Sequence, residues 1–168
     1  MDTNIQQDNT SDLREKTCFF TGHRDLPVGE YEAVKERLET EILRLMQEEG
    51  VQYFGAGGAL GFDTLASLTV IALKEKYPTI KLVLILPCKD HHFGWHGKDK
   101  AIFDRICAQA DKVIYTADKY YAGCAYKRNR HMAECAAWGL CYLTRPTGGT
   151  AYTVNFARSL GVKLKNLA

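Results

Sequence analysis

Several glycine-rich and arginine-containing segments of this chain come directly after short apolar runs. Glycine lets a loop turn its backbone N–H groups toward a phosphate, and arginine adds charge-assisted hydrogen bonds to that phosphate. Helices that begin at Asp63 and Thr150 would bring free N–H groups and a positive dipole end to the same place. The chemistry that this pattern indicates is anion binding. The candidate ligand-binding residues are Gly22, His23, Arg24, Gly57, Gly58, Ala59, Gly61, Asp63, Thr64, Pro87, Cys88, Trp95, Tyr121, Arg128, Arg130, Gly148, Gly149 and Thr150.

Each of these segments also has an ordinary structural interpretation. The glycines of residues 57–61 would make a strand-to-helix turn, with Asp63 acting only as a cap. Residues 148–150 would be a plain helix start, and Arg128 and Arg130 would be solvated surface residues. Three such segments at the ends of neighbouring strands favour a shared phosphate-binding role over three separate structural ones.

Standard nucleotide and catalytic motifs are absent. The sequence has no G-x-x-x-x-G-K-[ST] segment, so it is not a P-loop ATPase. Gly55, Gly57 and Gly61 resemble a dinucleotide fingerprint, but they follow the second apolar run rather than the first. The three serines lie in the N-terminal segment or within predicted helices, and none stands in a G-x-S-x-G nucleophile elbow.

A segment with one cysteine and three histidines follows the third apolar run. Cys88, His91, His92 and His96 could be metal ligands, but glycines around Trp95 make a helix unlikely there, and no H-E-x-x-H motif is present. We therefore expect a loop that covers a ligand, with no metal and no other cofactor. Trp95 would either anchor this loop or stack on a base, and the sequence leaves both interpretations open.

The apolar runs alternate with helical patterns along the chain. The runs are short, mostly continuous and rich in Val, Ile, Phe and Tyr, as in strands that are buried on both faces of a parallel sheet. The order of elements predicts a single α/β domain, a Rossmann-like, doubly wound, mainly parallel sheet with helices on both faces and a strand order near 3-2-1-4-5. The predicted strands are 17–21, 51–54, 81–86, 112–116, 139–144 and 162–166, and the predicted helices are 30–49, 63–76, 98–110, 127–137 and 150–160.

Composition narrows the class of protein. The chain has 168 residues, 46% hydrophobic and 25% charged, and a formal net charge of +2, which argues against nucleic-acid binding through bulk charge. Six cysteines without a C-x-x-C pair indicate reduced thiols. No signal peptide and no spanning segment is evident, so we expect a cytoplasmic protein with no membrane partner. Residues 1–16 are predicted to be a flexible lead-in, and residues 17–168 one domain.

Five segments together carry a family resemblance: CFFTGHRDLP at 18–27, GGALGFDTLA at 57–66, ILPCKD at 85–90, KRNRHM at 127–132 and GGTAYTV at 148–154. In this order they resemble the YpsA-like branch of the SLOG superfamily, over nearly the whole predicted domain. The resemblance implies a Rossmann-like fold with a nucleotide-related pocket at the strand ends. Members range from single-stranded DNA binders, through phosphoribohydrolases that act on nucleoside 5′-monophosphates, to sensors of nucleotide-derived signals of the ADP-ribose type.

The sequence departs from the hydrolytic members of that superfamily. Those enzymes carry an Arg followed by Lys and Met, and a P-G-G-x-G-T-x-x-E motif. Arg128 matches the arginine, but Asn129 stands in place of the lysine and Thr153 in place of the glutamate. Cleavage of an N-glycosidic bond needs a carboxylate, which threonine does not supply. Asp63 could substitute for it, although an aspartate at a helix start is more simply a cap or an acceptor for a ribose hydroxyl.

The sequence thus predicts a protein that binds a nucleotide or an ADP-ribose-like small molecule, as a sensor or sequestering protein with little or no turnover. Its catalytic residues, if any, stay unassigned. Two alternatives remain: a nucleoside 5′-monophosphate phosphoribohydrolase, and a module that binds single-stranded nucleic acid through Lys127, Arg128 and Arg130.

Self-association is the last expectation. The helix at 63–76 is apolar nearly all round, so one of its faces would stay exposed in a monomer and form the interface of a homodimer or a higher homo-oligomer. The alternative is that this helix is central and covered by its neighbours.

Overall fold

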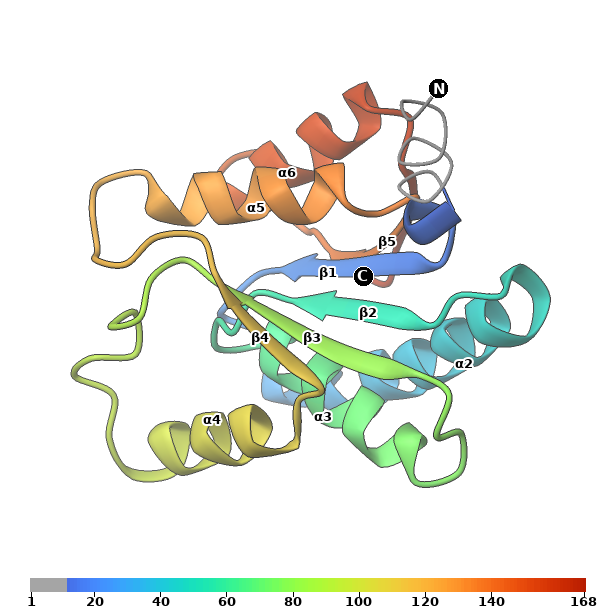
Figure 1. The fold of residues 1–168 in the computed structure, drawn as a ribbon, viewed down its shortest axis with the longest axis horizontal. Coiled ribbons are helices and arrows are strands. Elements are labelled where there is room, and N and C mark those ends of the chain that lie inside the picture. Colours follow the sequence, from blue (N-terminus) through green and yellow to red (C-terminus); the bar gives the residue numbers. More distant parts are fainter. Residues whose placement is uncertain (1–11) are drawn as a thin grey trace, which may run out of the picture.

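The computed structural model describes residues 12–168, which form a parallel six-stranded sheet with the order β4-β3-β2-β1-β5-β6 (Figure 1). Every neighbouring pair of strands is parallel. Strands β1 and β5 are nearly all buried, because helices cover the sheet on both sides of them. The strands are β1 (Thr17–Gly22), β2 (Tyr53–Ala56), β3 (Lys81–Leu86), β4 (Lys112–Tyr115), β5 (Trp138–Tyr142) and β6 (Lys163–Asn166).

The helices form a layer on each face of the sheet. Figure 1 shows α2, α3 and α4 on one face, and α5 and α6 on the other. A short 3-10 helix, η1 (Val28–Glu30), precedes α2. The helices are α2 (Tyr31–Glu49), α3 (Phe62–Lys74), α4 (Gly97–Gln109), α5 (Cys124–Glu134) and α6 (Gly149–Ser159). No helix of the described part is long and apolar enough to cross a membrane.

The predicted α/β class and Rossmann-like architecture are confirmed, but the predicted strand order is wrong. β5, not the fourth strand, pairs with β1, and β4 lies outside β3 at the sheet edge. The reason is that α4 lies on the same face of the sheet as α2 and α3, so β4 is added beside β3 at the same edge. The strand order therefore reverses after β4 and not after β3 as predicted. The chain therefore leaves β1 toward one face and β5 toward the other, and a crevice opens between their carboxyl ends.

The last part of the predicted lead-in, residues 12–16, lies within the described part of the chain. Residues 12–15 form a helical turn, whose Arg14 carbonyl accepts a hydrogen bond of 2.9 Å from the N–H of Ala137. The Trp138 indole N–H donates to the carbonyl of Glu15 over 3.1 Å. The expected lead-in thus already packs against the start of β5 from residue 12, and its residues 1–11 lie outside the described part of the chain.

Helix α3 is the central helix of its layer. It packs between α2 and α4 and against the sheet, and eight of its residues are buried, among them Leu65 and Val70. The apolar face of α3 is therefore covered by neighbouring helices and is not exposed as predicted, so α3 does not provide the predicted dimer interface.

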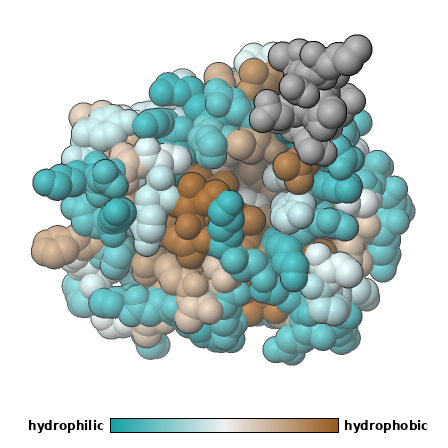
Figure 2. Space-filling view, viewed as in Figure 1, coloured by the Kyte–Doolittle hydropathy of each residue, from teal (hydrophilic) through white to brown (hydrophobic). Residues whose placement is uncertain are grey.

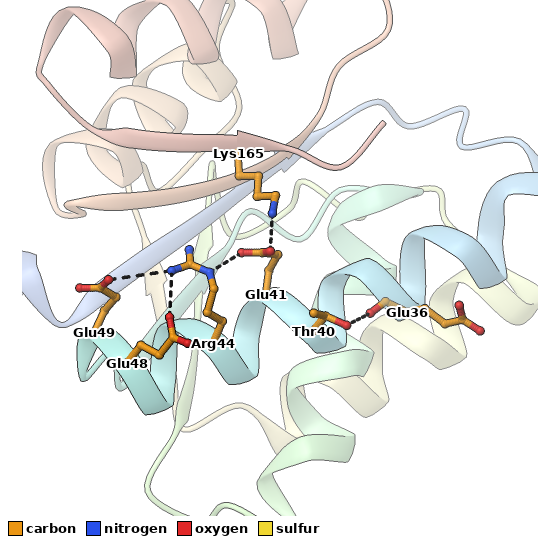
Figure 3. Close-up of polar contacts among 7 residues, drawn as sticks. All are labelled: Glu36, Thr40, Glu41, Arg44, Glu48, Glu49 and Lys165. Carbon is orange, nitrogen blue, oxygen red and sulfur yellow. Dashed lines mark hydrogen bonds and ion pairs between the residues drawn. The ribbon is translucent and has the colours of Figure 1, made fainter.

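A buried carboxylate ties the last strand to the first long helix. Glu41 of α2 is 5% exposed and accepts hydrogen bonds from Lys165 of β6 (2.5 Å) and Arg44 (2.9 Å) (Figure 3). Burial alone would raise the pKa of this carboxyl, but the two cationic donors outweigh it and hold the pKa below its ordinary value.

Candidate functional site

A hollow of about 530 Å³ opens at the carboxyl ends of β1 and β5, where the strand order reverses. We call it the large hollow. The loop after β1 and the loop after β5 form two of its sides, and the first turns of α5 and α6 form others. It is lined by Phe20, Thr21, Gly22, His23, Arg24, Asp25, Ala59, Asp63, Ala125, Tyr126, Arg128, Asn129, Arg145, Thr147, Gly148, Gly149 and Thr150.

Three helices begin at or beside this hollow, and each follows a glycine. Gly61, Gly123 and Gly148 are the N-cap residues of α3, α5 and α6, all with positive φ and none with a side-chain cap. The first N–H groups of a helix have no partner within it, so uncapped N-termini favour anions. Gly149 opens α6 with free space where a Cβ would stand, which leaves room for a ligand beside these N–H groups.

A buried pair of opposite charges forms the wall of the large hollow. Arg128 of α5 is 5% exposed, and its Nη1 donates to the carbonyl oxygen of Gly57. Asp63 of α3 is 6% exposed, and its Oδ2 accepts the N–H of Ala59 over 3.4 Å. The other oxygen, Oδ1, is buried without a hydrogen-bond partner among the described residues. Because buried carboxylate oxygens are rarely left unpaired, this atom indicates a place for a donor from a ligand.

Electrostatics at this wall favour an anion. Burial raises the pKa of Asp63 to about 6, although Arg128 and then Arg24 act against the rise. Burial lowers the pKa of Arg128. The negative charge of Asp63 acts to raise this pKa, and the like charge of Arg24 lowers it further. Arg24 makes no side-chain hydrogen bond or ion pair within residues 12–168. Two guanidinium groups therefore face a single carboxylate, which leaves a local excess of positive charge.

His23 is a neutral, fixed member of the site. Its ring is buried, and Nε2 accepts the backbone N–H of Thr144 over 2.9 Å. Burial, followed by the nearby charge of Arg145, lowers the pKa of His23 below its ordinary value. Nε2 is thus the acceptor of a neutral ring, and the ring proton lies on Nδ1.

A second hollow, of about 190 Å³, lies next to the first, and we call it the small hollow. Its lining comes from the segment after β3, the Tyr120 region and the first turn of α5. Arg24, Ala59, Ala125 and Arg128 line both hollows, whereas the small hollow alone is lined by Pro87, Cys88, His91, Trp95, Tyr120 and Cys124.

The histidine-containing segment packs as an aromatic cluster. The ring centroid of His91 lies 5.0 Å from that of Phe103 and 5.4 Å from that of Trp95. His92 stacks on Phe103 with a centroid distance of 4.7 Å. His96 is exposed and its Nδ1 lies 3.1 Å from the Gly94 carbonyl. Across residues 12–168, no three His, Cys, Asp or Glu side chains converge as metal ligands would. The described cysteines, which are all six of the chain, are free thiols.

The structure distributes the eighteen predicted residues over three places. Those at the large hollow are Gly22, His23, Arg24, Ala59, Asp63, Arg128, Gly148, Gly149 and Thr150, and those that line only the small hollow are Pro87, Cys88 and Trp95. The other six line neither hollow: Gly57, Gly58, Gly61 and Thr64 build the turn before α3, and Tyr121 and Arg130 lie at the surface.

Several lining residues escaped the sequence analysis. Asp25, Tyr126, Asn129, Arg145 and Thr147 line the large hollow. Arg145 and Thr147 stand immediately beside the predicted 148–150 segment, so the strand-end rule that found that segment could also have found them. Nothing in the residue pattern distinguished Tyr126 from other surface positions of a helix, whereas Asn129 was noted only as the replacement of a lysine in the hydrolytic members.

Thr153 occupies the position of the hydrolytic glutamate. It is 1% exposed and does not line the large hollow, and its hydroxyl donates to the carbonyl of Gly149 over 2.8 Å within α6. Its side chain is thus occupied in its own helix.

The family model YpsA, described as the YspA SLOG family, matches residues 18–155 of this sequence. The chain belongs to the YspA SLOG family. A relative described as a UPF0398 protein, from Bacillus pumilus, is 30% identical over 128 residues, which cover 71% of this chain and 68% of that protein. The SPbeta prophage-derived protein YoqJ of Bacillus subtilis is 28% identical over 137 residues, 74% of this chain and 80% of YoqJ. With a UPF0398 protein of Macrococcus caseolyticus, the match spans 65% of the relative's length.

Solved structures agree with this YspA SLOG assignment at the level of the fold. DNA processing protein A from Helicobacter pylori, described for its single-stranded DNA binding mode, superimposes with a TM-score of 0.65 at 19% identity, over 93% of this chain and 66% of that one. DNA processing protein A from Streptococcus pneumoniae gives 0.64 at 18% identity, over 91% and 50%. The family model confirms the predicted SLOG membership, and the solved structures confirm the fold.

Proposed function

We propose that this protein binds a nucleotide or an ADP-ribose-like molecule in the large hollow, as a sensor or sequestering protein with little or no turnover. The observation that carries the proposal is Asp63, a buried carboxylate with an unpartnered oxygen, beside Arg24 and Arg128 and between open helix N-termini. An acceptor oxygen suits a sugar hydroxyl, and the guanidinium and N–H groups suit a phosphate.

The phosphate is proposed to lie at the start of α6. Gly148 and Gly149 have no side chains at the N-terminus of that helix, and Thr150 lines the same hollow. Arg24, which has no partner of its own in the described structure, would neutralise the phosphate charge.

Low turnover follows from the carboxylates available. Thr153 replaces the expected glutamate, and Asp25 is held by Arg145. Asp63 is the remaining carboxylate at the large hollow, so hydrolysis of a nucleoside 5′-monophosphate is the alternative, with Asp63 as its acid or base. Release of free base from a nucleoside 5′-monophosphate, lost in Asp63→Asn, would decide for the enzyme.

A thermal-shift panel of nucleoside monophosphates, ADP-ribose and cyclic ADP-ribose isomers tests the proposal, because a ligand raises the apparent stability of the state that binds it. We expect a rise in the unfolding midpoint with at least one of these compounds, and a smaller rise in Arg24→Gln. Lys119→Gln, a charge change outside both hollows, is the matched control. No rise with any compound at millimolar concentration would contradict the proposal.

A second candidate function is binding of single-stranded nucleic acid. Tyr126 and Tyr152 pack edge to face at 4.9 Å and are 43% and 38% exposed, and Arg130 donates to the Tyr152 hydroxyl over 3.1 Å. Exposed aromatic rings beside cations suit base stacking, and two solved neighbours are DNA processing proteins. Binding of a labelled single strand should weaken steeply between low and moderate salt and be reduced in Tyr126→Ala.

The proposal includes a homodimer through a face other than α3. An apolar hollow of about 550 Å³ lies on the β2–β4 part of the sheet, lined by Val83, Ile85 and Ile114 among others. Figure 2 shows hydrophobic surface in this region, in the middle of the view. Exposed Lys112 and Glu134 also line this hollow. We propose a two-fold arrangement in which Lys112 of each copy pairs with Glu134 of the other. Light scattering tests this: Lys112→Glu should give monomer, and the double variant with Glu134→Lys should restore the dimer.

The cytoplasm is the proposed location. Six free thiols persist most readily in a reducing compartment.

A further inference from the structure

The small hollow is a separate space whose chemistry differs from that of the large one. Its lining contains three rings, from His91, Trp95 and Tyr120, and two thiols, but no carboxylate. Its only charged lining residues are Arg24 and Arg128, which it shares with the large hollow. The two hollows therefore meet at a polar boundary, with the aromatic chamber and the first residue of α5 on one side and the start of α6 on the other.

His91 lines the aromatic chamber and carries a buried hydrogen-bonding atom without a partner among the described residues. Its Nε2 lies 3.3 Å from the carbonyl of Gly58, and because a carbonyl only accepts, Nε2 carries the hydrogen. Burial lowers the pKa of His91 to about 4, so the ring is neutral near pH 7 and Nδ1 is an acceptor. This Nδ1 atom is buried and has no hydrogen-bond partner in the part of the chain that the structure describes.

The geometry points to one ligand that occupies both hollows: a nucleotide whose base lies in the small hollow, with Nδ1 of His91 accepting a hydrogen bond from an exocyclic amino group. This inference rests on the proposed function and adds the orientation of the ligand and the class of base. The ribose would then lie at the boundary, beside the unpartnered oxygen of Asp63, and the phosphate at the start of α6.

The reverse orientation fits the described residues less well. A phosphate in the small hollow would meet the start of α5, but it would also lie against thiols and aromatic rings and away from the open N-terminus of α6. A base in the large hollow would leave the buried acceptor of His91 without a donor, which costs free energy that a correctly placed amino group recovers.

Trp95 provides a direct signal for occupancy of the small hollow. The protein has two tryptophans, and Trp138 lies on β5, outside both hollows. In a Trp138→Phe background, the emission of Trp95 alone can be followed while AMP, IMP or ribose 5-phosphate is added. AMP and IMP differ at the exocyclic amino group, and ribose 5-phosphate lacks the base. Thermal shifts measured on the same samples report binding anywhere on the protein.

We expect all three compounds to raise the unfolding midpoint and only AMP and IMP to change Trp95 emission. AMP should bind about tenfold more tightly than IMP, the effect of one hydrogen bond to an otherwise unpaired buried acceptor. In His91→Phe, which keeps a ring against Phe103 but removes the acceptor, AMP and IMP should bind equally. His96→Phe, at an exposed position of the same segment, is the matched control and should keep the preference.

Three results separate failure of this inference from failure of the proposed function. If AMP and ribose 5-phosphate bind equally and Trp95 emission stays unchanged, the ligand lies in the large hollow alone, and the inference is wrong while the proposed function stands. If AMP binds no more tightly than IMP, or if His91→Phe keeps the preference, the role of His91 is wrong. If none of the three compounds binds, the inference is wrong, and the proposed function is then decided by the ADP-ribose compounds of the thermal-shift panel.

Discussion

Arg145 and Asp25 form a two-point ion pair that joins the loop after β5 to the loop after β1 at the large hollow. Nη1 and Nη2 of Arg145 lie 2.8 and 3.0 Å from the two carboxylate oxygens of Asp25, and both residues line that hollow. The guanidinium holds the pKa of Asp25 down at about 2, so the pair stays charged across the usual pH range. The charge of Arg145 is therefore already neutralised by Asp25, although Arg145 lines the large hollow.

The first prediction concerns this engaged arginine. Asp25→Asn should leave the unfolding midpoint nearly unchanged, because exposed ion pairs contribute little to stability. It should tighten the binding of a phosphate-containing ligand, since Arg145 is then free to pair with the phosphate. Isothermal titration of both proteins checks this, and weaker binding by Asp25→Asn would show that the pair organises the site instead.

The second prediction concerns the buried charge of Arg128. Arg128→Met leaves Asp63 buried without its cationic neighbour and leaves the Gly57 carbonyl without its donor. Removal of one partner from a buried charge pair typically costs about 3–5 kcal/mol, so urea denaturation should show a loss of that order. The double variant with Asp63→Asn should recover part of it. Equal stability of the single and double variants would contradict this account.

The third prediction is a pH dependence that arises from Asp63. Its pKa is about 6 in the folded protein and 3.8 unperturbed, so its contribution to stability is complete below about pH 4 and is lost as pH rises to about 6. A pKa shift of this size corresponds to a change of roughly 3 kcal/mol in the free energy of unfolding. The free energy of unfolding, measured in urea from pH 4 to 7, should fall less steeply with pH in Asp63→Asn than in the unsubstituted protein.

The fourth prediction concerns Glu41, whose pH dependence has the opposite sign. Its pKa is lowered in the folded state, so its contribution to stability is present above its ordinary pKa of 4.5 and is lost as the pH falls further. Glu41→Ala should cost about 2 kcal/mol by loss of its charged hydrogen bonds to Lys165 and Arg44 (Figure 3). Glu36→Ala, on an exposed turn of the same helix, is the control and should cost far less.

The fifth prediction separates a structural glycine from a ligand-binding one. A Cβ on Gly22 would lie 2.4 Å from the ring of Phe62, so Gly22→Ala should destabilise the fold by about 1–3 kcal/mol. A Cβ on Gly149 meets nothing within 4 Å, so Gly149→Ala should fold normally but bind phosphate-containing ligands more weakly. Chemical denaturation and ligand titration of both variants check this contrast. Unchanged ligand affinity in Gly149→Ala would remove the start of α6 from the site.

Much of the site could be predicted because strand ends are visible in the sequence. The segments at 22–24, 57–63 and 148–150 follow apolar runs, and parallel strands bring their carboxyl ends to one edge. The roles within these segments could not be predicted. Gly57 and Gly61 leave space for Arg128 and for the backbone of Arg24, which are contacts between residues far apart in the chain.

The sequence by itself determined the α/β class, the family and the edge of the sheet where the candidate site lies, because all three depend on the order and local pattern of residues. Only the tertiary structure decided that β5 pairs with β1, that α3 is covered and that Arg128 is buried against Asp63. It also decided that the site has two hollows, which meet at Arg24 and Arg128. The physical reason is that burial and pairing depend on which elements lie side by side, and an alternation of strands and helices is compatible with several such arrangements.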